Sequence, residues 1–242
     1  MTVRRIWIAA LLLMMLSGCT EERKQIVVPV SSAAIRSAQA QKAQMIEKLR
    51  QEFPKLKDNA AEALDSISRM LFVTDVARHR AYEDMALPIG SEQATLKPSD
   101  IGFLLSELDI QPNARILEIG TGTGYLAAVM SRLATEVYSV EIIEYLAEVA
   151  RGMLSRLKID NVHIRNQDGL QGWEKYAPFD VIVVTASVKQ VPDALVEQLK
   201  PGGLIAVPLR DEDITQWKIA RLENGELIEI ANRTSNVTPA IE

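Results

Sequence analysis

Residues 117–125 read Leu117-Glu118-Ile119-Gly120-Thr121-Gly122-Thr123-Gly124-Tyr125, and this stretch decides the fold. A β-prone run over 115–119 stops at Gly120, and a helical pattern begins at Tyr125. Glycines let a backbone turn pass close to a ligand, and the first N–H groups of the following helix are free to bind one. The stretch therefore predicts a strand, a ligand-binding turn and a helix.

The spacing of the glycines distinguishes between nucleotide ligands. The dinucleotide fingerprint G-x-G-x-x-G would require glycine at position 125, where the chain has Tyr125. The acidic Glu118 before the loop would repel a pyrophosphate, but it can hold an amino group directly or through water. We therefore expect a nucleoside with a cationic tail, S-adenosylmethionine. The candidate cofactor-binding residues in this stretch are Glu118, Gly120, Gly122, Gly124 and Tyr125.

Strand-like and helix-like segments alternate along the rest of the chain. Strands are predicted over 115–119, 136–140, 162–165, 179–184 and 204–207, helices over 125–133, 143–157 and 191–199, a turn over 201–203, and a terminal strand pair over 214–222 and 227–231. This alternation predicts an α/β fold with a mostly parallel sheet and helices on both faces. Ligands of such sheets bind at the carboxyl ends of the strands.

Polar residues follow three of these strands. Glu141 ends the second strand, 21 positions after Gly120, where a ribose-binding carboxylate belongs. Asp168 and Gly169 follow the third strand, where the carboxylate could accept the adenine amino group, and Thr185 ends the fourth at the floor of the cleft. Two plainer interpretations stay open: Glu141 as a charge at a helix N-terminus, and Asp168-Gly169 as a simple turn.

The composition excludes several classes of protein. The chain has 242 residues, 27 Lys and Arg against 32 Asp and Glu, and a net charge of −5, which argues against nucleic-acid binding. One cysteine excludes an internal disulfide framework and a cysteine-based zinc site, and two histidines leave little for a metal centre. We expect a monomer without a metal ion.

The N-terminus has the pattern of an export signal. Arg4 and Arg5 precede the apolar run 6–16, which is too short for a hydrocarbon core that needs about 20 residues but suits a signal peptide. The following Leu16-Ser17-Gly18-Cys19 resembles the lipobox of bacterial lipoproteins, which implies cleavage before Cys19 and its acylation. The alternative is an uncleaved anchor with an incidental cysteine. We predict a signal peptide over 1–18, a lipidated tether over 19–44 and a methyltransferase domain over 45–242.

Further motifs resemble one family, the protein-L-isoaspartate O-methyltransferases. They are Ala81-Tyr82-Glu83-Asp84, Ala86-Leu87-Pro88-Ile89-Gly90, the loop over 117–125, Ala177-Pro178-Phe179-Asp180 and Gln198-Leu199-Lys200-Pro201-Gly202-Gly203. The resemblance runs from about residue 45 to about residue 230. It implies a Rossmann-like class I methyltransferase fold. It also implies methylation, from S-adenosylmethionine, of the misplaced carboxylate of isoaspartyl residues in damaged proteins, which starts their repair.

One segment departs from the family pattern. After one variable residue the family usually reads G-Q-T-I-S-x-P, whereas this chain reads Glu92-Gln93-Ala94-Thr95-Leu96-Lys97-Pro98. The family places its serine at the substrate carboxylate and the cofactor, and Leu96 occupies that position here. The resemblance puts Gln93 nearest the acceptor and the cofactor, and Thr95 is the only candidate for a catalytic hydroxyl. Glu92 adds a negative charge where a carboxylate acceptor would approach.

Two functions are therefore carried forward. The first is an isoaspartyl-type protein carboxyl methyltransferase, impaired by Leu96. The second is a membrane-anchored, catalytically silent protein of the same fold that binds damaged or extended peptides. A lipidated Cys19 predicts a lipoprotein facing the periplasm, and Thr20 favours the outer membrane. Export would separate the protein from a methyl donor that is held inside the cell, and translation from Met45 would instead give a cytoplasmic enzyme.

Overall fold

The computed structural model describes residues 32–212 and 214–237. The predicted signal peptide and Cys19 lie outside the described residues. The chain forms two units, Met1–Ile35 and Arg36–Glu242, and the account below concerns the second. Within the described part of the chain, no helix combines the length and the apolar character that crossing a bilayer requires.

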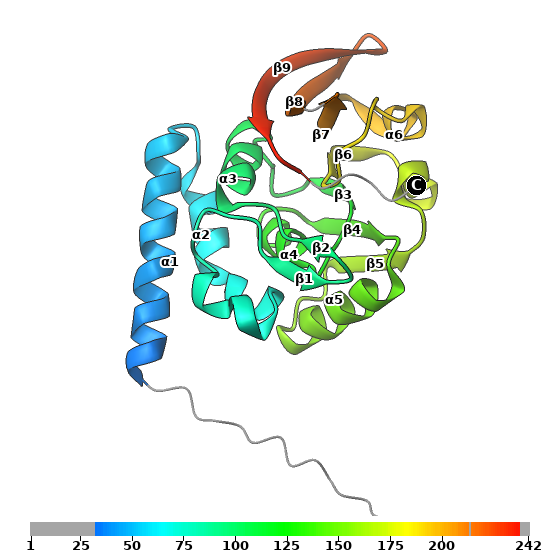
Figure 1. Ribbon diagram of the computed structural model, residues 1–242. Coiled ribbons are helices and arrows are strands. Elements are labelled where there is room, and N and C mark those ends of the chain that lie inside the picture. The colour runs from blue at the N-terminus through cyan, green and yellow to red at the C-terminus, as the bar shows by residue number, and fades with distance from the viewer. Residues whose placement is uncertain (1–31, 213, 238–242) are drawn as a thin grey trace, which may run out of the picture. The chain divides into compact units, whose positions relative to one another are not determined.

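A seven-stranded sheet forms the centre of the fold, in the order β5-β4-β3-β6-β7-β8-β9 (Figure 1). The neighbouring strands from β5 to β7 pair in parallel, and β8 and β9 join in antiparallel fashion. The strands are β3 (Arg115–Ile119), β4 (Glu136–Glu141), β5 (Val162–Asn166), β6 (Phe179–Val184), β7 (Leu199–Asp211), β8 (Ile214–Glu223) and β9 (Glu226–Ser235). This topology confirms the predicted, mostly parallel α/β sheet.

Helices cover both faces of this sheet. The α-helices are α1 (Ser32–Glu52), α2 (Asp58–Ser66), α3 (Pro98–Glu107), α4 (Tyr125–Met130), α5 (Glu144–Arg156) and α6 (Asp193–Glu197). Short 3-10 helices span Arg69–Phe72, Asp75–Arg80, Gly169–Gln171 and Glu174–Tyr176. Successive side chains of a strand point to opposite faces. β3 accordingly places Ile116 in the apolar cluster that includes Met130 and Trp217, and Leu117 in the one that includes Phe179 and Leu195.

The region before β7 differs from the prediction. The helix expected over 191–199 is only the five-residue α6, and the turn expected over 201–203 lies inside β7. Leu199 pairs with Phe179 and Leu204 with Val181, so the residues between them form a bulge in a continuous strand. The glycines that suggested a turn allow the backbone conformation of this bulge, where Gly202 has a φ of +79°.

The helix α1 crosses the predicted boundary between tether and domain. It begins at Ser32, so the last part of the segment predicted as a tether is helical. Met45, at the predicted start of the domain, is buried within the helix, and Lys42 forms an ion pair of 2.9 Å with Asp65. The helix ends at Glu52, before Pro54, as proline requires.

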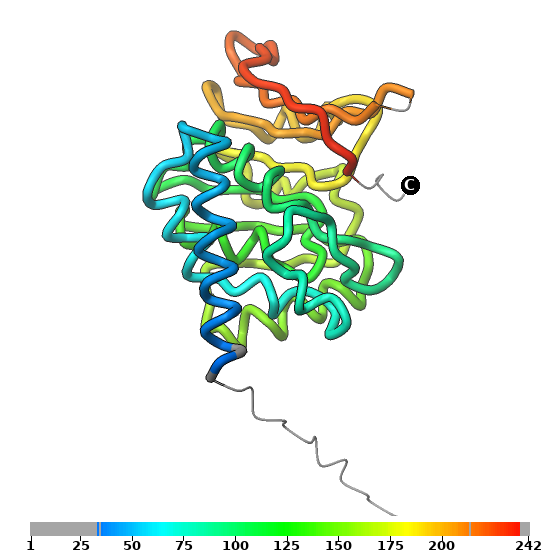
Figure 2. The backbone as a smooth tube through the Cα atoms, turned by 60° about the vertical axis from the view of Figure 1, so that its left-hand side comes forward, coloured from blue at the N-terminus to red at the C-terminus, as the bar shows by residue number. Residues whose placement is uncertain are grey.

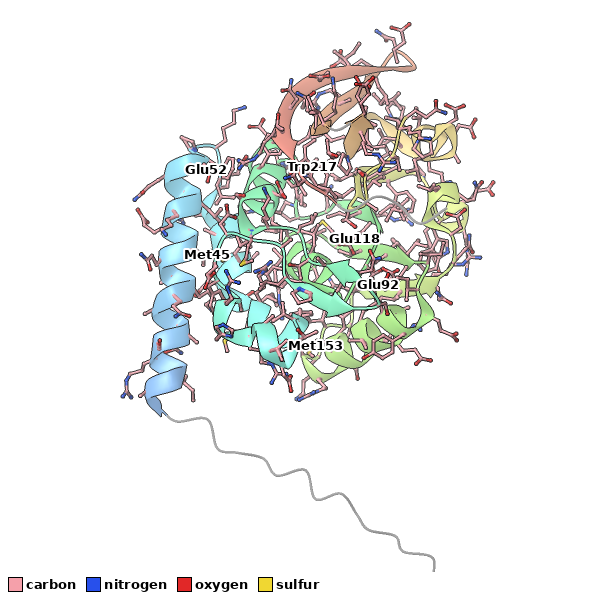
Figure 3. The ribbon with its side chains drawn as sticks, viewed as in Figure 1. Met45, Glu52, Glu92, Glu118, Met153 and Trp217 are labelled. Carbon is pink, nitrogen blue, oxygen red and sulfur yellow. The ribbon has the colours of Figure 1, made fainter. Side chains whose placement is uncertain are left out.

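A small hairpin places the ALPIG segment beside the carboxyl ends of the sheet strands. Its strands are β1 (Pro88–Gly90) and β2 (Gln93–Ala94). At its tip, Ser91 and Glu92 have φ angles of +51° and +59°, and Figure 3 labels Glu92 there. Only glycine adopts this left-handed region without a steric cost. The backbone therefore keeps the conformation that suits the family's glycine, although Glu92 now occupies the position.

Candidate functional site

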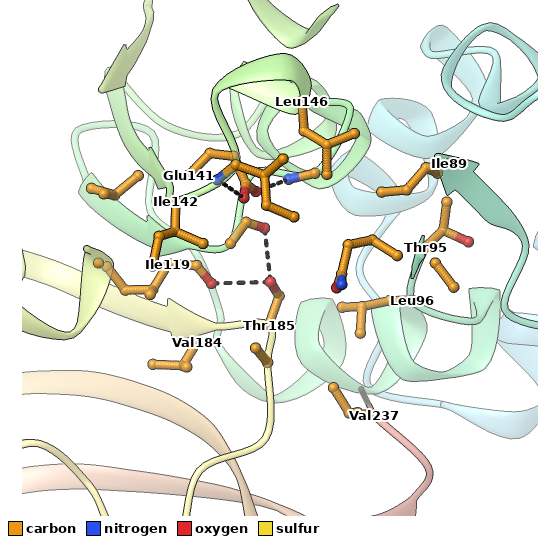
Figure 4. A pocket seen from close by; sticks show the side chains of 18 of the residues that line it. Ile89, Thr95, Leu96, Ile119, Glu141, Ile142, Leu146, Val184, Thr185 and Val237 are labelled. Carbon is orange, nitrogen blue, oxygen red and sulfur yellow. Dashed lines mark hydrogen bonds between the residues drawn. The ribbon is translucent and has the colours of Figure 1, made fainter. Parts of the chain in front are cut away.

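A cleft of about 900 Å³, its open mouth included, lies at the carboxyl ends of β3, β4 and β6 (Figure 4). One wall comes from these strand ends and the start of α5, and the opposite wall comes from the segment between β1 and α3. The cleft brings together the predicted residues Gln93, Thr95, Gly120, Gly122, Glu141, Asp168, Gly169 and Thr185.

The turn after β3 has the close backbone approach that its glycines predicted. A Cβ atom on Gly120 would lie 2.2 Å from Thr185 Oγ1, and Gly120 has a φ of +95°. The Thr185 hydroxyl donates to the carbonyl oxygens of Ile119 (3.0 Å) and Gly120 (2.7 Å), which ties the end of β6 to the turn (Figure 4). A side chain at Gly120 would break this contact and narrow the cleft.

Gly124 was predicted to line the methionine end of the ligand, and in the structure it lies against α5. A Cβ atom on Gly124 would lie 3.2 Å from Cβ of Ala150 on α5. Gly124 is absent from the lining of the cleft and of the smaller cavity beside it. The absence of a side chain there serves the packing of α4 against α5, because Gly124 is the N-cap residue of α4 with a φ of +92°.

Glu141 ends β4 with its carboxylate in the cleft. One oxygen accepts a hydrogen bond of 2.7 Å from the backbone N–H of Gly122, and the other accepts one of 2.9 Å from Ile143 (Figure 4). Burial raises the pKa of Glu141, and these backbone hydrogen bonds oppose the rise. The carboxylate is thus held in a fixed orientation, with acceptor capacity left for the hydroxyl groups of a ligand.

Glu118 faces the smaller cavity, which shares Thr95, Gly120 and Thr185 with the cleft and therefore adjoins it. Its side chain is fully buried, and Oε2 accepts a hydrogen bond of 2.5 Å from Ser139. Among the described residues, Oε1 has no hydrogen-bond partner. Burial raises the pKa of Glu118 to about 8. An unpaired, buried carboxylate oxygen at a cavity wall is a position that a positively charged donor would satisfy.

The other predicted residues after β5 and in α4 contribute to these walls. Asp168 lines the cleft and accepts a hydrogen bond of 2.9 Å from Leu170, so it also caps the turn that follows. A Cβ atom on Gly169 would lie 2.5 Å from Cγ2 of Ile119, which explains the glycine. Tyr125 is buried beside Glu118 at the smaller cavity.

The cleft wall between β2 and α3 is held by a residue that the sequence analysis missed. Arg69 is fully buried and donates to Thr95 Oγ1 (2.5 Å) and to the carbonyl oxygen of Leu96 (2.8 Å). Thr95 Oγ1 also accepts from the N–H of Leu87 (3.1 Å). The lone pairs of the Thr95 hydroxyl are therefore used within the fold, which leaves only its proton for a ligand. The half-buried Leu96 side chain lines both cavities.

Asp100 is a second residue that was missed. Its side chain is buried, lines the cleft, and accepts a hydrogen bond of 2.7 Å from Ser235 at the end of β9. Figure 2 shows the red end of the described chain running back from the β8–β9 region toward the body of the molecule, and Val237 lines the cleft together with Val184 and Thr185. Among the described His, Cys, Asp and Glu side chains, no group of three or more is placed to hold a metal ion.

Comparisons with known proteins identify the family of this chain. Residues 40–238 match the family described as protein-L-isoaspartate(D-aspartate) O-methyltransferase (PCMT). The protein-L-isoaspartate O-methyltransferase of Geobacter metallireducens is 42% identical over 168 residues, 69% of this chain and 78% of that protein. The one from Opitutus terrae is 41% identical over 165 residues, 68% of this chain and 71% of that protein.

Solved structures give the same fold. A protein-L-isoaspartate O-methyltransferase superposes with a TM-score of 0.75 and 28% identity, covering 83% of this chain and 66% of that one. A Plasmodium falciparum structure described as a "putative protein-L-isoaspartate O-methyltransferase", in complex with S-adenosyl-L-homocysteine, superposes with a TM-score of 0.71 and 21% identity, covering 82% of this chain and 97% of that one. The Rossmann-like class I methyltransferase fold is confirmed. This chain, with its glycine turn, its strand-end carboxylate and its ALPIG hairpin around one cleft, belongs to the protein-L-isoaspartate O-methyltransferase family.

Proposed function

We propose that this chain transfers a methyl group from S-adenosylmethionine to the misplaced carboxylate of isoaspartyl residues in damaged proteins. The observation that carries the proposal is the meeting of the glycine turn, Glu141 and the β1–β2 hairpin at one cleft. The first two belong to the predicted donor side and the hairpin belongs to the predicted acceptor side. Their meeting is what direct transfer between two bound molecules requires.

The residues present fit the donor. The unpaired oxygen of Glu118 would hold its amino group, Glu141 its ribose hydroxyls, and Asp168 its adenine amino group. When bound, S-adenosylmethionine supplies an electrophilic methyl group on a sulfonium centre. Glu118 and Glu141 sit on neighbouring parallel strands, so the sheet itself fixes the spacing of the two carboxylates.

The acceptor side has less chemistry to perform. A carboxylate with a reference pKa near 4 is already ionised at neutral pH, so no general base is required. The protein contributes alignment and the exclusion of water. Ile89, Leu96 and Val237 form an apolar boundary there (Figure 4). The Leu96 side chain cannot donate a hydrogen bond to an incoming carboxylate, and we propose that Leu96 lowers activity for this reason.

Leu96→Ser is expected to raise kcat/KM for an isoaspartyl peptide by about tenfold. A hydrogen bond to a charged group contributes roughly 1.5–3 kcal/mol, and about 1.4 kcal/mol corresponds to a factor of ten in rate. The measurement is transfer of labelled methyl from S-adenosylmethionine to the peptide. Ile228→Ser, an exposed position on β9, is the matched control and should leave the rate unchanged. A rate for Leu96→Ser at or below that of the wild type would count against the assignment.

The second candidate function is a silent, membrane-anchored protein that binds damaged or extended peptides. Leu96 in the acceptor wall and the negative charge of Glu92 at the hairpin tip favour it. Calorimetry with S-adenosylmethionine and with an isoaspartyl peptide, on the same preparation as the transfer assay, separates the two functions. Binding of both molecules without transfer, in the wild type and in Leu96→Ser, would establish the silent protein.

We further propose that the chain is a lipoprotein, anchored through Cys19 and facing the periplasm, with the outer membrane favoured. Met45 is buried in the second half of α1, so translation from Met45 would remove more than half of that helix together with the ion pair of Lys42. This observation favours the longer product. Mass spectrometry of the mature N-terminus from fractionated cells should find an acylated Cys19 in the membrane fraction. An unmodified Cys19, or a product that starts at Met45, would refute lipidation.

A further inference from the structure

Asp100 places a carboxyl group on the acceptor side of the cleft, next to the position where the family serine is missing. It lies in the first turn of α3, and Leu96 lies just before that helix. Both residues line the same cleft together with Val237. The side chain of Asp100 is 1% exposed, and Oδ1 accepts a hydrogen bond of 2.7 Å from Ser235 Oγ. Among the described residues, Ser235 is the side-chain donor to Asp100, and Oδ2 has no hydrogen-bond partner.

The surroundings of Asp100 decide which protonation state it adopts. The nearby charged groups are Lys97 before its own helix, Arg233 on β9, and Asp84 in the segment before β1, with Glu141 across the cleft. The cations favour the ionised form, and the carboxylates disfavour it. Burial is the largest influence, and it raises the pKa of Asp100 above its ordinary value. Ser235 holds the group in place in either state.

We propose that Asp100, in its protonated form, donates a hydrogen bond from Oδ2 to the carboxylate of the methyl acceptor and so replaces the contact that Leu96 cannot make. Two carboxyl groups share a desolvated site when one proton lies between them. The bond keeps the acceptor ionised and oriented, and the proton stays with Asp100 while the methyl group is transferred. This inference rests on the proposed isoaspartyl methyltransferase activity.

The first test is the pH profile of kcat/KM for an isoaspartyl peptide, measured on the full chain in mild detergent with saturating S-adenosylmethionine. The wild-type value should fall as the pH rises through the pKa of Asp100, because the donor proton is lost. Asp100→Asn keeps an oxygen for Ser235 and supplies an N–H donor at every pH, so its profile should be flat in that range. Asp160→Asn, at an exposed position, is the matched control and should keep the wild-type profile.

The second test removes the donor entirely. Asp100→Leu should lower kcat/KM by about 10- to 100-fold, the range expected for one hydrogen bond to a charged group. Adding Leu96→Ser to Asp100→Leu should restore most of the loss, and its gain should exceed the gain of Leu96→Ser alone, because the two donors serve the same carboxylate. Calorimetric binding of S-adenosylhomocysteine verifies that each variant retains a folded donor site.

The outcomes separate this inference from the function on which it rests. An Asp100→Asn profile that matches the wild type would overturn the inference alone, since transfer would persist. A wild-type profile that rises with pH and flattens in Asp100→Asn would also overturn it, because Asp100 would then act as a base toward an uncharged acceptor. If no peptide is methylated at any pH while S-adenosylmethionine binds, the proposed function and the inference both fall.

Discussion

Glu118→Gln is expected to raise the free energy of unfolding by several kcal/mol at pH 9 and to change it little at pH 5. The wild-type carboxyl is fully buried, and burial raises its pKa from an ordinary 4.5 to about 8. Above pH 8 the folded protein must therefore carry a buried negative charge with one unpaired oxygen. Glutamine has nearly the same shape, can still accept from Ser139, and carries no charge at any pH.

The sign of the effect follows from proton linkage. Between pH 4.5 and about 8 the unfolded chain has lost the proton of Glu118 and the folded chain still holds it, so wild-type stability falls as the pH rises through that window. At about 1.4 kcal/mol for each pH unit, the full window corresponds to roughly 5 kcal/mol. Urea denaturation of both proteins at pH 5, 7 and 9 measures the difference. An equal difference at the three pH values would show that Glu118 does not titrate in this range.

The same carboxyl couples the pH to ligand affinity. An ammonium group beside Glu118 favours its ionised form, so binding at neutral pH must release the proton, and affinity rises with pH. We expect the affinity for S-adenosylhomocysteine to rise about 10- to 30-fold between pH 6 and 7.5. 5′-Methylthioadenosine lacks the amino-acid group and serves as the control ligand, since it still meets Glu141 and Asp168. If the affinity for both ligands rose similarly with pH, the proton released on binding would come from a group other than Glu118. Glu141 would be the next candidate.

The donor side of this site could be predicted from the sequence because its residues stand at the ends of predicted strands. Gly120 and Gly122 stand directly between a strand pattern and a helix pattern, and Glu141 and Thr185 end predicted strands. In a parallel sheet those strand ends meet at one edge, so the fold brings the residues together once the alternation is recognised. The same reasoning does not tell a glycine that helix packing requires, as at Gly124, from one that lines a ligand, because both have the same sequence signature.

The rest depends on contacts between distant segments. Asp100 meets Ser235 across 135 positions, and the pairing arises only because the chain returns from β9 to the cleft. Compared with the family pattern, the sequence shows at Leu96 only that a hydroxyl is missing. The structure is needed to show that the buried carboxyl of Asp100 lies beside the same cleft. The bulge in β7 was also missed, since Gly202 favours a turn and a bulge equally.

Arg69→Met is expected to lower the free energy of unfolding by about 3–5 kcal/mol and to weaken acceptor binding while sparing donor binding. The fully buried guanidinium joins three segments that have no regular structure to hold them. Its hydrogen bonds run to the carbonyl oxygens of Ala81 (2.7 Å), Met85 (3.0 Å) and Leu96 (2.8 Å) and to Thr95 Oγ1 (2.5 Å). Methionine fills much of the same space and leaves the three carbonyl oxygens without their donor, which costs roughly 1–3 kcal/mol for each one that water cannot reach, while Thr95 Oγ1 keeps the N–H of Leu87.

Arg69→Met should affect acceptor binding more than donor binding because of where the hydrogen-bond partners of Arg69 lie. All of them belong to the segments that carry the acceptor wall, and none belongs to the ends of β3 or β4. KM for an isoaspartyl peptide should therefore rise, with little change in the affinity for S-adenosylhomocysteine. Hydrogen exchange should report the loosening at Thr95, whose N–H donates to the Leu87 carbonyl oxygen (2.9 Å).

Two substitutions separate the geometry of the guanidinium from its charge. Arg69→Lys keeps a cation but loses the planar fork, so it should recover only part of the stability. Arg78→Met removes an exposed arginine paired with Asp75 at 2.8 Å and should change stability by no more than about 1 kcal/mol. If Arg69→Met weakened both ligands equally, the acceptor wall and the donor site would be one cooperative structure. Substitutions in the acceptor wall could then not change acceptor binding without also changing donor binding. The interpretation of Leu96 and Asp100 depends on that separation.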